Sequence, residues 1–187
     1  MNLYIKQRIF TWGDKFSIYD EFGNERYYVE GEVFTFGKKL HLYDTAGNEL
    51  AYIEQKLFSF NPRYNVYRQG YVIAQIIKEF TFFKQEYDVD GLGWRVHGDF
   101  FAHCYEITNY GLSVASVSKE WFTLGDAYEI RVAEGVDEVN ALAVVLVIDA
   151  CIGLSNSSRS KKPYFETSIA SAAPRATIIW VLMPASF

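Results

Sequence analysis

A few clusters of titratable side chains could carry chemistry in this chain. His97-Gly98-Asp99 has the spacing of two ligands in a 2-His-1-carboxylate iron site, which needs a second histidine from a distant strand. His103, four residues after Asp99, is the last histidine of the sequence. Because no later histidine can complete the site, we interpret residues 97–99 as a turn between two strands.

Two other clusters have simple structural interpretations. Asp88-Val89-Asp90-Gly91 begins like a calcium loop, but Leu92 stands where another oxygen ligand is needed, so we predict a hairpin turn. His103 and Cys104 could form a thiol–imidazole pair, but neighbouring residues of a strand point to opposite faces. We therefore interpret Cys104 as a core cysteine beside an unrelated histidine, and Cys151 as a small buried hydrophobe.

Asp149 is the carboxylate that follows the most apolar run of the sequence. A buried carboxylate must find a partner or take up a proton, and the dipole of a helix disfavours negative charge near its C-terminal end. We predict a structural hydrogen bond for Asp149, with a functional role as the alternative. The sequence has no Walker loop, nucleophile elbow or dinucleotide fingerprint. We therefore predict no enzymatic activity, no cofactor and no metal.

The elements that would position these residues begin with a repeat. Residues 16–25 and 40–49 share an apolar–polar alternation that ends in Tyr-Asp, followed by a Gly-Asn dipeptide and a glutamate. This pattern is typical of a β-hairpin. Gly23-Asn24 and Gly47-Asn48 should therefore form equivalent turns, because glycine permits the positive φ that such turns need. We assign both turns to the scaffold.

Hairpins follow one another over the first 133 residues, and an aromatic content of 18% suits the half-buried surfaces of β-sheets. We predict a mainly β protein with about twelve strands, near 3–10, 15–20, 25–30, 39–44, 49–57, 64–68, 71–80, 83–89, 94–98, 103–108, 112–121 and 127–133.

Three of these strands end in a lysine that lies close before an aromatic residue: Lys56, Lys78 and Lys119. We interpret them as solubilising lysines at sheet edges. A row of lysines that faces a ligand is the alternative.

The pattern changes near residue 137. Asp137 is a plausible N-cap, and residues 141–148 contain no polar side chain, so we predict a helix near 137–152. Leu142 and Leu146 should be structural residues of this helix. A bilayer span needs about 20 apolar residues, so enclosure by protein is favoured over enclosure by lipid.

The last part of the chain differs in composition. Residues 155–187 hold seven serines and three of the four prolines, and they carry a net charge of +3 against −8 for the rest. We predict a domain over 1–153 and a disordered or non-native tail over 154–187. The total formal charge of −5 gives no footprint for nucleic acid. Two cysteines without metal or disulfide spacing, and the lack of a secretory signal, favour a cytoplasmic protein, which we expect to be a monomer.

The order of these motifs resembles the LURP-one-related family, which includes the bacterial YxjI-like proteins. The resemblance rests on the two Tyr-Asp-x-x-Gly-Asn-Glu turns and on four further segments: Tyr28-Val29-Glu30-Gly31 before Phe34, residues 94–100, residues 125–130, and the helix that ends in Val147-Ile148-Asp149. It implies a tubby-like fold, a closed antiparallel barrel of twelve strands around a central apolar C-terminal helix. Relatives with that fold include tubby proteins, which bind phosphoinositides, and phospholipid scramblases.

We therefore predict a non-catalytic binding module that associates with a membrane surface or a phospholipid, peripheral to the membrane. Its candidate basic residues are Lys38, Lys39, Arg63 and Arg68, provided that they cluster on the surface. The alternative is a regulatory scaffold that binds another protein through exposed aromatic side chains.

Overall fold

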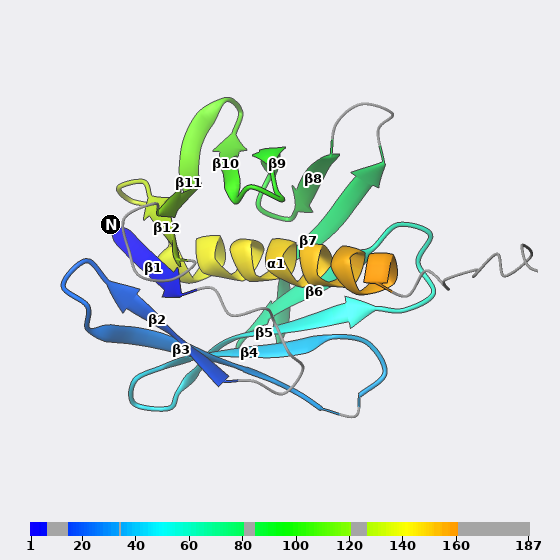
Figure 1. Ribbon diagram of the computed structural model, residues 1–187. Helices are drawn as coiled ribbons and strands as arrows, with labels where there is room; N and C mark the ends of the chain where they lie inside the picture. The colour runs from blue at the N-terminus through cyan, green and yellow to red at the C-terminus, as the bar shows by residue number, and fades with distance from the viewer. Residues whose placement is uncertain (7–14, 34, 81–84, 121–126, 161–187) are drawn as a thin grey trace, which may run out of the picture.

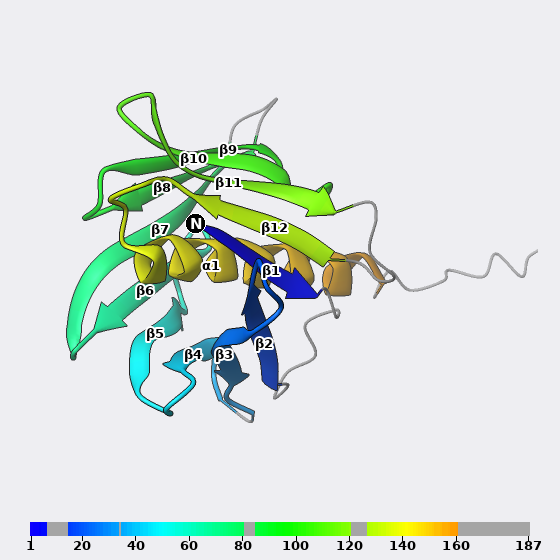
Figure 2. The same ribbon diagram turned by 90° about the vertical axis from the view of Figure 1, so that its left-hand side faces the viewer.

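The computed structural model describes residues 1–6, 15–33, 35–80, 85–120 and 127–160. Within these residues, twelve antiparallel strands close into one barrel, and a single helix runs through its interior (Figures 1 and 2). Each strand pairs with its neighbours in sequence, and the first strand pairs with the twelfth. The predicted closed barrel is confirmed.

The strands lie close to their predicted positions. Their bounds are β1 (Asn2–Lys6), β2 (Lys15–Asp20), β3 (Glu25–Gly31), β4 (Lys39–Asp44), β5 (Glu49–Lys56), β6 (Arg63–Arg68), β7 (Tyr71–Phe80), β8 (Gln85–Asp90), β9 (Trp94–Asp99), β10 (Cys104–Asn109), β11 (Leu112–Glu120) and β12 (Ala127–Val132). Residues 7–10, 83–84 and 121, also predicted as strand, lie outside the described residues, as does the predicted tail from residue 161 onward.

The barrel interior is filled by alternate strand residues and by the helix α1 (Glu138–Ser160). Every residue from Ala141 to Ile148 is at most 1% exposed, and this includes the predicted structural residues Leu142 and Leu146. A helix whose whole circumference is apolar needs an apolar environment on all sides, and the closed barrel provides it. Among the described residues, no helix has both the length and the hydropathy required to cross a membrane.

The start of α1 agrees with the prediction, but its end does not. The Asp137 carboxylate accepts hydrogen bonds from the backbone N–H groups of Val139 and Asn140 at 3.0 and 3.1 Å, as an N-cap does. The helix continues through Ser160, so residues 154–160, predicted as the start of a disordered tail, belong to α1. Serine and glycine each lower helix propensity by no more than about 1 kcal/mol, too little to stop a helix that is already formed.

The two repeated turns have the same contacts. Asp20 Oδ1 accepts hydrogen bonds from the N–H groups two and four residues later, at 2.9 and 2.8 Å, and Asp44 Oδ1 does the same at 2.9 and 2.8 Å. Gly23 and Gly47 have φ values of +80° and +87°. Asn24 and Asn48 each donate a side-chain N–H to the aspartate of their own turn. The predicted equivalence of the two turns is confirmed.

Candidate functional site

The strand order places alternate connections at opposite ends of the barrel. The β3–β4, β5–β6 and β9–β10 connections lie at the end toward which α1 runs, and Figure 1 shows the first two on the right. The β2–β3, β6–β7 and β10–β11 turns lie at the other end, where α1 begins. The two ends therefore present different side chains to a partner.

The end at which α1 leaves the barrel carries a group of exposed apolar side chains. Phe36 is 92% exposed, and Phe58 and Phe60 are fully exposed at 105% and 102%. Val33 and Leu57 are exposed beside them. We call these five residues, Val33, Phe36, Leu57, Phe58 and Phe60, the aromatic rim. Monomers rarely expose several large apolar side chains together unless they form a binding surface.

Local hydrogen bonds hold the two rim loops in this shape. Gly37 has φ of +84°, and a Cβ placed on it would lie 3.2 Å from the Gln55 carbonyl oxygen and 3.3 Å from Leu57 Cδ2. The β3–β4 loop thus packs closely against the end of β5. In the β5–β6 loop, the Ser59 hydroxyl donates to the carbonyl oxygens of Lys56 and Asn61, at 3.2 and 2.7 Å.

Lys38 points from the β3–β4 loop into the barrel. Its ammonium group is buried and donates a hydrogen bond to the carbonyl oxygen of Ala150 in α1, at 2.6 Å. Its backbone N–H donates to Gln55 Oε1 at 3.0 Å, and its carbonyl oxygen accepts from the Gln55 N–H at 2.7 Å. Burial lowers the pKa of Lys38 to about 8, against the opposing effect of nearby Cys151 and Asp149.

Asp149 lies one residue before Ala150 and is also buried. The Tyr128 hydroxyl donates to Asp149 Oδ2, and His103 Nδ1 lies 3.7 Å from Asp149 Oδ1. The predicted hydrogen bond of Asp149 is therefore confirmed. Burial raises the pKa of Asp149 to about 7, although the Tyr128 hydrogen bond and the Lys38 charge lower it. Because α1 ends at Ser160, Asp149 is in mid-helix and the predicted unfavourable dipole effect at a helix end does not apply.

Further buried polar groups surround this part of α1. Burial raises the pKa of the Cys151 thiol to about 11, and it also raises the pKa of the Tyr64 and Tyr87 hydroxyls that face the thiol. Lys78 Nζ is buried 6.0 Å from the centre of the Tyr87 ring. The interpretation of Lys78 as an edge lysine is therefore wrong, since the closed barrel leaves no sheet edge at β7 and Lys78 faces inward with Ala74 and Ile76.

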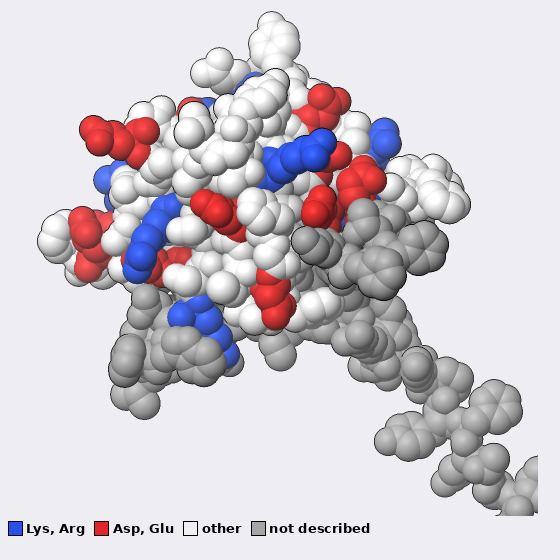
Figure 3. All heavy atoms as spheres, turned by 90° about the horizontal axis from the view of Figure 1, so that it is seen from above, with Lys and Arg blue, Asp and Glu red and all other residues white. Residues whose placement is uncertain are grey.

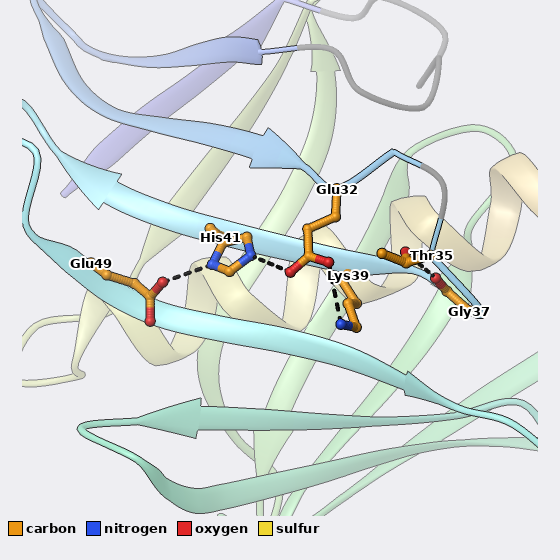
Figure 4. A network of polar contacts seen from close by, with 6 residues as sticks. All are labelled: Glu32, Thr35, Gly37, Lys39, His41 and Glu49. Carbon is orange, nitrogen blue, oxygen red and sulfur yellow. Dashed lines mark hydrogen bonds and ion pairs between the residues drawn. The ribbon is translucent and has the colours of Figure 1, made fainter.

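The outer face of the barrel has its own polar network (Figure 4). His41 Nδ1 lies 2.7 Å from Glu49 Oε2, His41 Nε2 lies 3.0 Å from Glu32 Oε1, and Lys39 Nζ lies 3.2 Å from Glu32 Oε2. The hydrogen bond with His41, followed by that from Lys39, holds the pKa of Glu32 below its usual value. Carboxylates only accept hydrogen bonds, so both contacts of His41 are satisfied when the imidazole carries two protons.

These groups stabilise the surface by contacting each other. The His41 ring also packs between Tyr43 and Tyr52, with ring centres 6.0 and 4.8 Å apart. His41 and Tyr52 are direct cross-strand neighbours, and such a pair stabilises a sheet by about 0.2–1 kcal/mol. A substrate would have to displace these partners before it could reach the histidine, so we assign the network to the scaffold.

The four basic candidate residues do not gather in one patch. Lys38 is buried and Lys39 is paired with Glu32. Arg63 begins β6 at the rim end, whereas Arg68 ends the same strand at the opposite end and pairs with Asp137 at 2.5 Å. On the face shown in Figure 3, Lys and Arg side chains are interspersed with Asp and Glu.

The structure corrects two sequence interpretations. His97, Gly98 and Asp99 form the end of β9 rather than a turn. Gly98 has φ of +141°, and a Cβ there would lie 2.5 Å from the Tyr105 Cα, so a glycine is needed for close strand packing. Nowhere in the described ranges do three histidine, cysteine or acidic residues group as metal ligands.

The second correction concerns Cys104, which is exposed while His103 is buried. Tyr105 and Ile107 face the interior, so Cys104, one residue earlier in the alternation, must point outward. The prediction that Cys151 is buried is confirmed, and residues 88–91 lead into a hairpin turn, as predicted, with Gly91 at φ of +91°.

Comparison with known proteins identifies the class. Residues 1–149 match the family model described as LURP-one-related, so the chain belongs to the LURP-one-related family. It is 35% identical over 149 residues to Uncharacterized protein YxjI of Bacillus subtilis (strain 168), a match that covers 80% of this chain and 92% of that relative. A protein of Arabidopsis thaliana with an X-ray structure has a similar fold, with a TM-score of 0.61 and 18% identity over 81% of this chain and 90% of the other.

The aromatic rim was missed in the sequence. A signal was present, because each of the two rim loops contains a Phe-x-Phe tripeptide, residues 34–36 and 58–60, shortly after a predicted strand. Strand alternation would place two residues that are two positions apart on the same face, but it does not say whether that face is the interior or the exterior. Only the loop geometry shows that Phe58 and Phe60 both point outward.

Proposed function

We propose that the protein is a non-catalytic binding module that docks on a membrane surface through its aromatic rim. The observation that carries this proposal is the full exposure of Phe36, Phe58 and Phe60 on two loops that pack against each other. The side chains project from one end of a rigid barrel, which is a suitable shape for insertion into the headgroup region of a bilayer. The tubby-like class and a peripheral cytoplasmic location stay predictions that agree with this function.

The apolar contribution is large enough to support binding. Burying a phenylalanine side chain is worth about 1.5–3 kcal/mol relative to leaving it in water. Each rim phenylalanine that enters the bilayer should therefore increase affinity by about tenfold or more.

The charges beside the rim favour insertion over electrostatic attraction. Lys39 pairs with Glu32, and Lys56 pairs with Glu54 at 2.6 Å. These basic side chains are therefore largely neutralised by neighbouring acids. We expect binding to vesicles of zwitterionic phosphatidylcholine as well as to anionic vesicles, with a weak dependence on salt.

Co-sedimentation with vesicles of each composition tests this proposal. The double variant Phe58→Ser/Phe60→Ser should lose at least about tenfold in partitioning. Phe22→Ser is the matched control, because Phe22 is 81% exposed at the opposite end of the barrel. The proposal fails if wild-type protein stays in the supernatant with both vesicle types at low salt, or if the control variant loses as much binding as the rim variant.

A protein partner is the second candidate function. Tyr71, Tyr110 and Leu112 are exposed on the turns at the opposite end of the barrel, and tyrosine is enriched in protein interfaces. This alternative gains support if the rim variant binds vesicles normally while Tyr71→Ser/Tyr110→Ser loses a partner captured by the wild-type protein.

A further inference from the structure

The β3–β4 loop, which carries Phe36 of the rim, is connected to α1 by the side chain of Lys38. Lys38 follows Gly37 and sends its ammonium group inward to the Ala150 carbonyl oxygen at 2.6 Å. The same residue exchanges two hydrogen bonds with Gln55, at 3.0 and 2.7 Å. Gln55 in turn lies three residues before Phe58. Lys38 thus joins the helix to both loops of the rim.

The charged groups around Lys38 determine the free-energy penalty of burying its ammonium group. Of the carboxylates in the described residues, Asp149 and Glu129 are buried, and Glu129 pairs with Arg131 at 2.7 Å. Asp149 therefore supplies the negative charge to Lys38, and each of the two groups affects the pKa of the other. The other titratable groups that face this part of the interior are Cys151 on α1, Tyr64 on β6, Lys78 on β7, Tyr87 on β8, His103 before β10, Tyr105 on β10 and Tyr128 on β12.

We propose that Lys38 and Asp149 form a proton-dependent latch that holds the β3–β4 loop against α1, and that acidification releases the loop and weakens docking by the rim. The latch itself follows from the buried contacts of Lys38. Its effect on docking rests on the proposed membrane function.

The direction of the pH effect follows from the charges. The Lys38 charge lowers the pKa of Asp149, so this pKa is lower in the latched form than in a form with Lys38 in solvent. A group whose pKa is lower in the latched form than in the open form favours the latched form at high pH. This contribution is lost as the pH falls through the pKa of the latched form. Since the pKa of Asp149 in the latched form is about 7, the latch should weaken as the pH falls through 7. The buried ammonium group is then left without its negative partner, and water becomes the more favourable environment for it.

A released loop should bind membranes less well. In the latched form Gly37, the residue after Phe36, packs against Leu57, and this contact fixes the loop in the arrangement that the rim presents. A flexible loop must be ordered on binding, and this ordering reduces affinity.

Amide hydrogen exchange at pH 7.5 and pH 6.0 tests the latch on the full chain. The backbone N–H groups of Lys38 and Gln55 report on the loop, because they form its two hydrogen bonds with β5. After correction for intrinsic exchange rates, we expect their protection to fall about three- to fourfold between the two pH values, because Asp149 with a pKa of about 7 in the latched form already takes up much of the proton there, which limits the linked change over this range. Amides in the middle of β4 and β5 should keep their protection.

Three variants make the result specific. Asp149→Asn retains an acceptor for Tyr128 but cannot titrate, and Lys38→Met removes the cation. Both should show low protection at both pH values and no pH dependence. His41→Gln is the control, since His41 is a neighbouring titratable group that contacts Glu32 at the start of the same loop, and it should keep the wild-type pH dependence.

Equal wild-type protection at the two pH values would overturn the latch, as would loss of the effect in His41→Gln alone. Vesicle co-sedimentation at both pH values tests the second half of the proposal, and we expect several-fold weaker binding at pH 6.0. A protein that shows the exchange effect but never binds vesicles would disprove the membrane function and leave the latch intact.

Discussion

The Lys38 ammonium group and the Ala150 carbonyl oxygen are 2.6 Å apart, inside a barrel whose interior is otherwise mainly apolar. This contact connects a surface loop with the central helix. Neighbouring residues of this loop point in opposite directions: Phe36 points to solvent, whereas Lys38, two residues later, points inward. A surface for binding and a buried charged group are therefore built from neighbouring residues.

The repeated turns should contribute to stability alone. Gly23→Val and Gly47→Val place a β-branched residue at φ of +80° and +87°, which should lower the free energy of unfolding by roughly 1–3 kcal/mol. Gly23→Asn is the matched control and should cost less, because asparagine tolerates positive φ. Chemical denaturation measures all three. A valine variant as stable as the wild type, or one that lost vesicle binding at unchanged stability, would show that the turn is not simply scaffold.

The central helix should not accept a charge. Leu146 is fully buried, and Leu146→Asp would place a carboxylate without a partner among apolar side chains. We expect no soluble folded protein, whereas Leu146→Met, which nearly conserves volume, should cost less than about 1.5 kcal/mol. Circular dichroism during heating provides the measurement. Cooperative melting of the aspartate variant near the wild-type temperature would contradict the enclosed position of α1.

Asp149 should make global stability depend on pH. Its pKa is raised from 3.8 to about 7 in the folded protein, so the folded state holds a proton that the unfolded state has already released. Stability should therefore fall as the pH rises from about 4 to 7. Asp149→Asn should lack this component, so the melting temperature of the wild type relative to the variant should decrease over that range. A constant difference would show that Asp149 does not titrate as stated.

Lys38 should act in the opposite direction at higher pH. Its pKa falls from 10.5 to about 8 on folding, so the folded state releases a proton that the unfolded state still holds. This group should therefore increase stability as the pH rises from about 8 to 10.5. The melting temperature of the wild type relative to Lys38→Met should rise over that range. The unfolding equilibrium is distinct from opening of the latch, in which Asp149 stays buried.

The parts of the fold that local sequence determines were predictable. Period-2 alternation and the Asp-x-x-Gly-Asn turns place the strands, because each turn fixes the pairing register of its hairpin. The wholly apolar stretch 141–148 predicted an enclosed helix. The end of α1 was not predictable in the same way, since Gly153 and the serines after it suggest a helix end, while the structure continues the helix to Ser160.

The candidate site was less predictable because it depends on non-local contacts. Nothing near Lys38 in the sequence indicates that its ammonium group reaches Ala150, 112 residues later. Lys38 and Lys39 look equivalent in the sequence, yet one is buried and the other pairs with Glu32 on the outer face. Which loops share one end follows only from the closed strand order.

Fluorescence of an environment-sensitive NBD probe at a single engineered cysteine tests the central claim most directly. Cys104→Ser removes the exposed native thiol, and the buried Cys151, whose pKa is about 11, should not react. With phosphatidylcholine vesicles, a probe in place of Phe58 should brighten and shift to shorter wavelength as it enters the bilayer, while a probe in place of Phe22 should not change. An unchanged probe at position 58, or an equal response at position 22, would contradict docking through the aromatic rim.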